Sequence, residues 1–290
     1  MSSYAIVTDS TCDLPQTIVT QYNIIVIPLE FTIDGHSYLN TTDETALPAK
    51  EFYKLLREGS VSLTSQIPVQ RYLEIFEKIL LEGKDVLYLC FSSALSGSFN
   101  SSWVAAGELS FEYPKRKIYI VDTKAASLGE GLLVYHAAIK NEHGYTIDKL
   151  KMWVEENRDH FCHWFIVDDL HHLKRGGRIS PTTAAVGTLL NVKPVLRVDS
   201  EGRLIPMEKV RGRRKALGKL VDVMEKNCTE PEEQTVFIGH GDCLEDAKYL
   251  EQLVRSRIPV KDVLIEYIGP IIGSHTGPDM VSLFYRGTGK

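Results

Sequence analysis

Phe91–Trp103 reads F-S-S-A-L-S-G-S-F-N-S-S-W and directly follows Val86–Cys90, an apolar run that predicts a buried strand. The segment is rich in serine, and Gly97 lies among the hydroxyl groups where a helix is expected to begin. Backbone N–H groups at the start of a helix are unpaired, and the helix dipole favours negative charge there. These serines therefore have two possible roles, which are to cap the helix or to bind an anion.

The residues around this segment alternate between short apolar runs and amphipathic stretches. Strands are predicted at Tyr4–Thr8, Ile24–Phe31, Asp85–Phe91 and Lys117–Asp122. Helices are predicted at Leu47–Leu56 and Asp148–Arg158. A polar loop at Ser62–Val69 is expected to open a further helix that ends at Leu81. Two more helices are predicted, one after the serine segment and one that ends at Lys140. The strands lack polar alternation, which is typical of parallel strands covered on both faces. This order predicts a parallel α/β layer in the first half of the chain.

The pattern changes near His163, where a strand is followed by H-H-L-K-R-G-G-R-I-S-P. Lys193–Val198 and Leu204–Val210 are predicted to form a hairpin around the turn D-S-E-G. Helices are predicted at Thr182–Leu190, Arg213–Lys226 and Leu244–Arg257, and strands at Thr235–His240 and Asp262–Ile268. A polar loop, G-S-H-T-G-P, and a final strand are expected to end this part of the chain.

A hairpin combined with crossover connections predicts a mixed sheet, so the sequence predicts an α/β protein with two domains. Residues 1–165 are expected to form a three-layer parallel-sheet domain that carries Thr64 and Ser96. Residues 166–290 are expected to form a second α/β domain, with a mixed sheet, that carries His275.

Composition narrows the class of protein. The 290-residue chain has a net charge of −5, which argues against a nucleic-acid surface. The N-terminal residues lack the pattern of a signal peptide, and no apolar run approaches the roughly 18–20 residues that span a bilayer. The cysteines are scattered and form no C-x-x-C pair, which predicts reduced thiols. A soluble cytoplasmic protein without stable membrane insertion is therefore expected.

Four polar segments lie at strand ends or helix starts, and they are Asp9–Thr11, Thr64–Gln66, Ser92–Ser98 and Gly273–Pro278. In an open α/β sheet, loops at the carboxyl ends of the strands converge on a ligand crevice. Together the four segments predict a pocket lined by hydroxyl groups and one histidine, His275. That histidine could donate to a bound anion, act as a general base or bridge loop carbonyls.

Other kinds of chemistry find less support in the sequence. A Ser96–His275 pair could serve a hydrolase, but the chain has neither a G-x-S-x-G elbow nor an evident orienting carboxylate. His160, Cys162 and His163 lack the spacing of a zinc site, and no nucleotide-binding motif is present. Neither a metal nor a cofactor is expected. The run Lys174–Arg178 could cradle phosphate or could form a solvated turn.

The polar segments, in this order, resemble the DegV family over nearly the whole chain. The resemblance rests on T-D-S-T-C-D-L-P, T-S-Q, S-S-A-L-S-G-S, I-Y-I-V-D-T, L-K-R-G-G-R-I-S, N-V-K-P-V-L, R-G-R-R-K and I-G-P-I-I-G-S-H-T-G-P. It implies a two-domain α/β fold that holds one long-chain fatty acid, such as palmitate or oleate, between the domains. It also implies a role as the fatty-acid-binding subunit of fatty acid kinase. There the carboxylate is presented to a separate ATP-using subunit and phosphorylated to acyl-phosphate for phospholipid synthesis.

The resemblance assigns roles to particular residues. Thr64 and Ser96 match residues that hydrogen-bond the fatty acid carboxylate, and His275 matches a histidine of the surrounding polar network. Ser65, Gly97 and Thr276, which lie beside them in the same motifs, complete the expected binding site. Arg175 and Arg211 match arginines that form a docking surface for the kinase subunit.

The chain departs from the family pattern at three places. Ile67-Pro68 follows T-S-Q where the pattern has Pro then Ser, Ser98 replaces a common threonine, and Asp279 replaces a common glycine. The first departure bears on how the loop lies over the ligand, whereas the second keeps the hydroxyl group.

Burial of a fatty acid is energetically reasonable in such a site. About fourteen methylenes at roughly 0.8 kcal/mol each contribute on the order of 11 kcal/mol, which offsets the cost of burying a hydrogen-bonded carboxylate. Because the hydroxyl groups could offset this cost, no cation need be buried beside the carboxylate, which fits the absence of Lys and Arg from the four polar segments, and the acid could be ionised or protonated. The alternatives are a hydrolase or a phosphotransferase of the dihydroxyacetone-kinase type using Ser96 and His275, or a lipid sensor.

Overall fold

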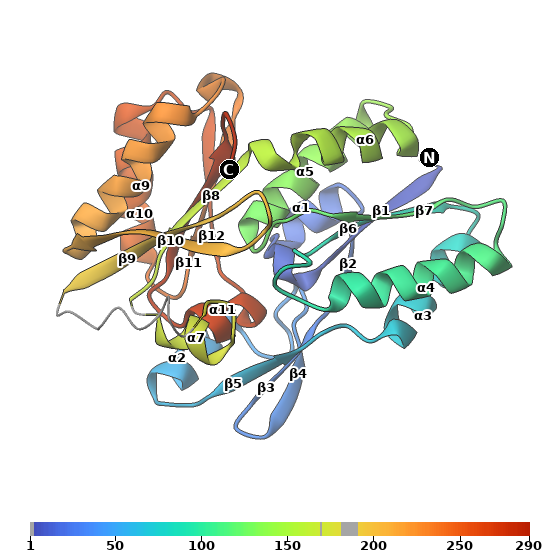
Figure 1. Cartoon of the computed structure of the whole chain (residues 1–290), viewed down its shortest axis with the longest axis horizontal. Helices are drawn as coiled ribbons and strands as arrows, with labels where there is room; N and C mark the ends of the chain where they lie inside the picture. Colours follow the sequence, from blue (N-terminus) through green and yellow to red (C-terminus); the bar gives the residue numbers. More distant parts are fainter. Residues whose placement is uncertain (1–2, 169, 181–190) are drawn as a thin grey trace.

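The computed structural model describes residues 3–168, 170–180 and 191–290, and it contains three β-sheets (Figure 1). We call them sheet A (order β2-β1-β6-β7), sheet B (order β4-β3-β5) and sheet C (order β10-β9-β8-β13-β11-β12). Sheets A and C are the larger two, and helices cover both of them. The α/β fold class with a parallel sheet and a mixed sheet is therefore confirmed.

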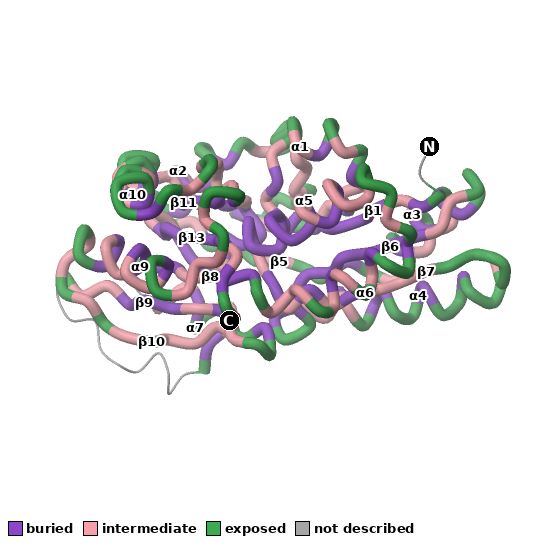
Figure 2. The backbone as a smooth tube through the Cα atoms, turned by 90° about the horizontal axis from the view of Figure 1, so that it is seen from above, coloured by how far each residue is buried: buried purple, intermediate pink, exposed green. Residues whose placement is uncertain are grey.

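Sheet A is parallel throughout and takes its strands from the first half of the chain. Its strands are β1 (Tyr4–Asp9), β2 (Ile25–Ile27), β6 (Asp85–Cys90) and β7 (Ile118–Asp122). Its helices are α3 (Val69–Leu81), α4 (Ser98–Glu112), α5 (Leu128–Glu142) and α6 (Ile147–Asn157). Alternate residues of β6 pack into two different cores, Tyr88 with α3 and α4, and Leu87 with α5 and α6. The central strands are therefore buried on both faces (Figure 2), as a parallel sheet requires.

Sheet C is mixed, with β11 and β12 parallel and the remaining pairs antiparallel. Its strands are β8 (Phe161–Ile166), β9 (Val192–Val198), β10 (Leu204–Arg211), β11 (Thr235–His240), β12 (Asp262–Tyr267) and β13 (Val281–Arg286). One face packs against α9 (Arg213–Asn227) and α10 (Leu244–Arg257), while α5 contacts the other face from between sheets A and C. The predicted hairpin is present as β9 and β10.

Sheet B is an addition that the sequence patterns do not predict. It consists of β3 (Glu30–Ile33), β4 (His36–Leu39) and β5 (Ser62–Ser65), all antiparallel. The single strand expected at Ile24–Phe31 is wrong, because the chain leaves sheet A after β2 and enters sheet B at β3. Pro28 lies at the break and has no N–H to donate to a ladder. The stretch Ser62–Val69, expected to be a polar loop, begins instead with strand β5.

The G-S-H-T-G-P segment is also not a loop, because most of it belongs to helix α11 (Pro270–Thr276). Pro270 occupies the first turn, where a missing N–H costs nothing, and Gly277 leaves the helix with a φ of 76°. The other short elements are α1 (Gln16–Gln21), α2 (Ala49–Arg57), α7 (His171–Arg175) and the 3-10 turns Ser10–Cys12, Arg158–His160 and Pro231–Glu233. The helix expected at Thr182–Leu190 lies outside the described residues.

The two-domain division at residue 165 stays a prediction. Strand β8 spans that position and pairs with β9 and β13 in sheet C. Sheet B, although built from the first half, packs in one core with α11 of the second half. All five cysteines are free thiols. Within the described part of the chain, no helix is both long and apolar enough to cross a membrane.

Gly239 tests how tightly sheet C is packed, and Gly107 in α4 serves as its control. A Cβ at Gly239 in β11 would lie 2.2 Å from Ile268 Cδ1 and 2.6 Å from Ser282 Oγ, whereas one at Gly107 in α4 would have no neighbour within 4 Å. We expect Gly239→Val to lower the free energy of unfolding by about 1–3 kcal/mol through overpacking. The control, Gly107→Ala, should raise it by roughly 0.5–1 kcal/mol, because Ala favours the helix. Urea unfolding monitored by circular dichroism measures both changes, and equal stabilities would contradict the packing of β11.

Candidate binding site

A cavity of about 270 Å³ lies where the three sheets meet. Its wall combines β5, the serine segment before α4, the start of α5, strands β8 and β13, the hairpin β9–β10, and helices α7 and α11. Residues from positions 29 to 284 contribute, so no single sheet encloses it. Every residue that the sequence assigned to fatty-acid binding lines this cavity, namely Thr64, Ser65, Ser96, Gly97, His275 and Thr276.

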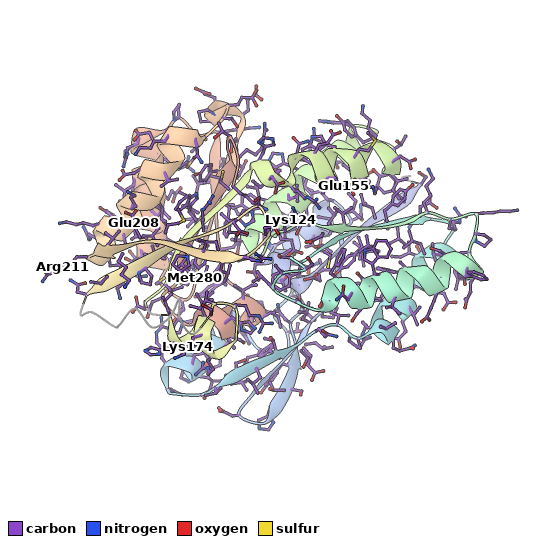
Figure 3. All side chains as sticks on the ribbon, in the orientation of Figure 1. Lys124, Glu155, Lys174, Glu208, Arg211 and Met280 are labelled. Atoms are coloured by element: carbon purple, nitrogen blue, oxygen red, sulfur yellow. The ribbon has the colours of Figure 1, made fainter. Side chains whose placement is uncertain are left out.

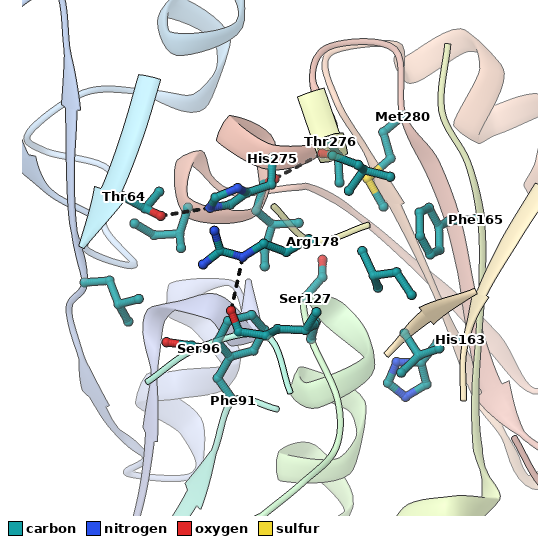
Figure 4. Close-up of a pocket in the computed structure, with 18 of the residues that line it drawn as sticks. Thr64, Phe91, Ser96, Ser127, His163, Phe165, Arg178, His275, Thr276 and Met280 are labelled. Carbon is teal, nitrogen blue, oxygen red and sulfur yellow. Dashed lines mark hydrogen bonds between the residues drawn. The ribbon is translucent and has the colours of Figure 1, made fainter. Parts of the chain in front are cut away.

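The cavity has a polar end and an apolar remainder (Figure 4). Thr64, Ser96, Arg178 and His275 gather at one end. Mostly apolar side chains line the rest, including Phe165, Val198, Leu204, Ile272, Met280 and Phe284, and the side chains of Ser127 and His163 lie among them. We call these two parts the polar end and the apolar part of the cavity. An elongated molecule with one polar terminus matches this division of the wall.

Strand β5 places Thr64 at the polar end. Because side chains alternate along a strand, Ser62 and Thr64 face α11, while Leu63 between them points outward and is 64% exposed. The hydroxyl of Ser62 is hydrogen-bonded to that of Ser274 at 2.7 Å, and Thr64 Oγ1 lies 2.8 Å from His275 Nε2. The strand and the helix therefore hold the hydroxyl and the imidazole together.

His275 is a neutral imidazole in this setting. Burial lowers its pKa to about 4, with further contributions from the positive charges of Arg178 and Arg175. Gly176 lies against the ring, because a Cβ there would be 2.1 Å from His275 Nδ1. Nδ1 is buried and has no hydrogen-bond partner among the described residues. With its Nε2 engaged by Thr64, the ring is suited to hydrogen bonding rather than to taking a proton from Ser96.

The serine segment forms the opposite side of the polar end. Ser96 Oγ donates to Ser98 Oγ at 3.0 Å and accepts from the Ser98 backbone N–H at 3.2 Å. Ser98 Oγ also accepts from the backbone N–H of Ile67 at 3.2 Å, which links this segment to the T-S-Q segment. A Cβ at Gly97 would overlap the amide end of the Gln66 side chain, so the two segments approach closely here. Hydroxyl groups here both organise the helix start and line the cavity.

Arg178 is a residue of the polar end that the sequence did not assign to the site, and Ser127 and His163 are further polar residues of the wall that it did not assign. Arg178 lies half-buried at the polar end, with Nε donating to the carbonyl of Leu95 at 3.1 Å and Nη1 donating to the carbonyl of Gly176. Arg178 therefore brings a cation to the polar end, which the four polar segments themselves do not supply. The signal was present in the run Lys174–Arg178, which has the composition of a phosphate cradle, but its side-chain direction depends on the contact with Leu95. Burial lowers the pKa of the guanidinium.

The remaining predicted positions lie elsewhere. Asp9–Thr11 does not line the cavity but forms a buried network with Glu130, so only three of the four polar segments converge. Arg175 is exposed and hydrogen-bonded to His172 Nδ1 at 2.8 Å. Arg211 is exposed at the end of β10, at the outer edge of the molecule (Figure 3). Among the described residues, no group of three or more His, Cys, Asp or Glu side chains could hold a metal ion.

The fold and the cavity define an α/β protein with an internal pocket that is polar at one end. Comparison with known proteins is consistent with this class. The chain belongs to the DegV family, since the model of that family, described as an uncharacterised protein family, matches residues 3–288.

Relatives match the chain over its full length. A DegV domain-containing protein of Clostridium perfringens is 48% identical over 290 residues, covering 100% of this chain and 99% of that protein. A fatty-acid-binding DegV family protein from Thermus thermophilus superposes with a TM-score of 0.89 at 31% identity, covering 98% of this chain and 99% of that one. DegV of Bacillus subtilis, a fatty acid binding protein, superposes with a TM-score of 0.84 at 28% identity. The match covers 99% of this chain and 100% of that one.

The neutral state of His275 predicts a pH-dependent stability. The folded protein resists protonation of this ring until about pH 4, whereas an unfolded histidine takes up its proton near pH 6.5. Stability contributed by the neutral ring is therefore present above about pH 6.5 and is lost as the pH falls towards 4. Between about pH 7 and pH 4, we expect the free energy of unfolding to fall by about 2–3 kcal/mol more in the wild-type protein than in His275→Gln. Urea unfolding across this range measures it, and parallel losses in both proteins would contradict the assignment.

Proposed function

We propose that this protein binds one long-chain fatty acid in the cavity. The carboxylate lies at the polar end, near Thr64, Ser96, Arg178 and His275, and the acyl chain lies along the apolar part. The observation that carries the proposal is a cavity in which Thr64, Ser96, Arg178 and His275 gather at one end while mostly apolar side chains line the remainder, with Ser127 and His163 among them. The related proteins from Thermus thermophilus and Bacillus subtilis support it, because both bind fatty acids.

The energetics assign different roles to the two parts. Each buried methylene contributes about 0.8 kcal/mol, so the apolar part supplies most of the affinity. A buried carboxylate costs several kcal/mol unless it is paired and hydrogen-bonded. Hydrogen bonds to a charged group contribute about 1.5–3 kcal/mol each, and the Arg178 guanidinium adds a favourable charge. The polar end therefore offsets the desolvation of the carboxylate and fixes its position.

The bound acid is further proposed to be a substrate for a separate kinase subunit. In that reaction a carboxylate oxygen attacks the γ-phosphorus of ATP, the bond to ADP breaks, and an acyl-phosphate forms. Arg175 and Arg211 support this role as exposed cations outside the cavity, and Arg175 lies three residues from Arg178. An acidic surface on the partner would complement them. A hydrolase is less well supported, because His275 bonds Thr64 rather than Ser96.

Ligand retention tests the binding site. We expect a long-chain fatty acid to co-purify with the wild-type protein and to appear in denaturing mass spectrometry. Thr64→Ala with Ser96→Ala should weaken binding of added oleate about 10²–10⁴-fold, since each of the two lost charged hydrogen bonds contributes about 1.5–3 kcal/mol. Ser110→Ala, which removes an exposed hydroxyl on α4 outside the cavity, serves as the control. Absence of bound acid and of oleate uptake would refute the proposal.

Charge reversal tests the partner surface. Arg175→Glu and Arg211→Glu should each weaken binding to the kinase subunit at least about tenfold, because a favourable charge contact becomes repulsive. Both variants should retain the fatty acid, since neither side chain lines the cavity. Arg71→Glu, on the exposed side of α3, is the matched control. Surface plasmon resonance with the subunit measures the change, and unaltered affinity in both variants would exclude this surface.

A further inference from the structure

Two polar side chains lie in the apolar part of the cavity, away from the polar end. Strand β8 contributes His163 to this part of the wall, and the residue that precedes α5 contributes Ser127. Figure 4 shows His163 on the opposite side of the cavity from Thr64. A plain acyl chain that runs along this part has no polar group to offer either side chain.

The fold buries His163 in the wall and leaves it without a hydrogen bond. Side chains alternate along β8, so His163 faces the same way as Phe161 and Phe165, whereas Cys162 and Trp164 pack on the other side of the sheet. The residue is 1% exposed, and neither Nδ1 nor Nε2 has a hydrogen-bond partner among the described residues. Buried polar groups are normally hydrogen-bonded, so this imidazole is an exception that requires an explanation.

The neighbours of the imidazole hold it at this position on the wall. Phe284, its partner across β8 and β13, meets the ring edge to face, with the ring centroids 5.4 Å apart. Helix α5 approaches the ring closely, because a Cβ at Gly129 would lie 2.4 Å from both Cε1 and Nδ1 of His163. These contacts are apolar, so they position the ring without satisfying its nitrogen atoms.

The imidazole is uncharged at neutral pH. Burial lowers the pKa of His163 well below its ordinary value, and the positive charge of Lys290 acts in the same direction. A neutral imidazole has one N–H donor and one nitrogen acceptor. The ring is therefore suited to a neutral hydrogen-bonding group, whereas an anion would gain no charge attraction from it.

Ser127 narrows the chemistry of that group. Its Oγ donates to Asp13 Oδ2 at 2.6 Å, so its hydrogen is already used and its lone pairs remain. Ser127 precedes by two residues the Gly129 that the ring contacts, which places it near His163 along the wall. A ligand group that meets both side chains can accept from the imidazole N–H and must donate to Ser127 Oγ. A hydroxyl does both, whereas a carbonyl or an ether oxygen cannot donate.

We propose that the cavity prefers long-chain fatty acids that carry a hydroxyl group in the half of the chain distant from the carboxylate, and that His163 and Ser127 bind this hydroxyl. The proposal rests on the proposed function, since the carboxylate must lie at the polar end for the hydroxyl to reach His163. It makes His163 and Ser127 specificity-determining residues of the same cavity.

The cost of burying the imidazole is the reason for this preference. The ring has already lost its water in the folded protein, so a ligand hydroxyl that bonds it removes the penalty of an unpaired buried group. A plain chain leaves both ring nitrogen atoms unpaired. An ordered water between His163 and Ser127 could be exchanged for a hydroxyl with its hydrogen bonds kept, whereas a methylene group could not keep them.

Comparison of hydroxylated and plain acids tests the proposal. We expect the wild-type protein to bind at least one of 10-hydroxystearate, 12-hydroxystearate and 16-hydroxypalmitate about tenfold more tightly than the plain acid of the same length. This preference should fall about tenfold or more in His163→Leu, because the hydroxyl loses its donor while the plain chain gains an apolar neighbour. His163→Gln, which keeps a donor and an acceptor, should retain part of it. Isothermal titration calorimetry measures each dissociation constant.

The matched control is His136→Leu. His136 is a partly buried histidine of α5 that packs edge to face on Phe161 and does not line the cavity. Its removal should leave the preference as it is in the wild-type protein.

The outcomes separate this proposal from the proposed function. Plain acids that bind the wild-type protein as tightly as every hydroxylated acid would overturn the proposal, and this result depends on no variant. An unchanged preference in His163→Leu would also overturn it. Both results leave the proposed function intact, whereas failure of every acid to bind the wild-type protein would refute the proposed function itself.

Discussion

Two side-chain hydrogen bonds between β5 and α11 are the constraint on which the site depends. They join Ser62 to Ser274 at 2.7 Å and Thr64 to His275 at 2.8 Å. Polar groups removed from water need partners, so these pairs fix the strand against the helix. Sheet B, which otherwise has few strands to stabilise it, is thereby held against the second half of the chain. The cavity closes because this contact is made.

The K-R-G-G-R run shows how one turn can serve two surfaces. Arg178 reaches the polar end of the cavity, while Arg175 remains exposed. Gly176 between them allows the backbone to approach the His275 ring, where any side chain would collide with Nδ1. Cations on both sides favour a neutral imidazole, which leaves the guanidinium as the positive charge nearest a bound anion. A single turn thus sets the electrostatics of the polar end.

The sequence predicts the sheets with long apolar strands and the residues of the polar end, but not how they are brought together. Thr64, Ser96 and His275 were identified from motifs, whereas their mutual geometry depends on sheet B and α11. Ser62–Ser65 and Pro270–Thr276 have only four and seven residues, which is too short for apolar periodicity to distinguish a strand or a helix from a loop. The direction of Arg178 is set by the carbonyl of Leu95, 83 residues away. Long-range contacts of this kind leave no local pattern.

The long separation between the two sides of the polar end also bears on biosynthesis. Thr64 and His275 are 211 residues apart, so the hydrogen bond between them cannot form until α11 has been translated. At about 5–20 residues per second, the T-S-Q segment waits roughly 10–40 s for its partner. During that interval sheet A can form from contiguous chain, but the pocket stays open on the side that α11 will cover. A ribosome-bound chain of this protein can therefore form sheet A before the wall of its cavity is complete.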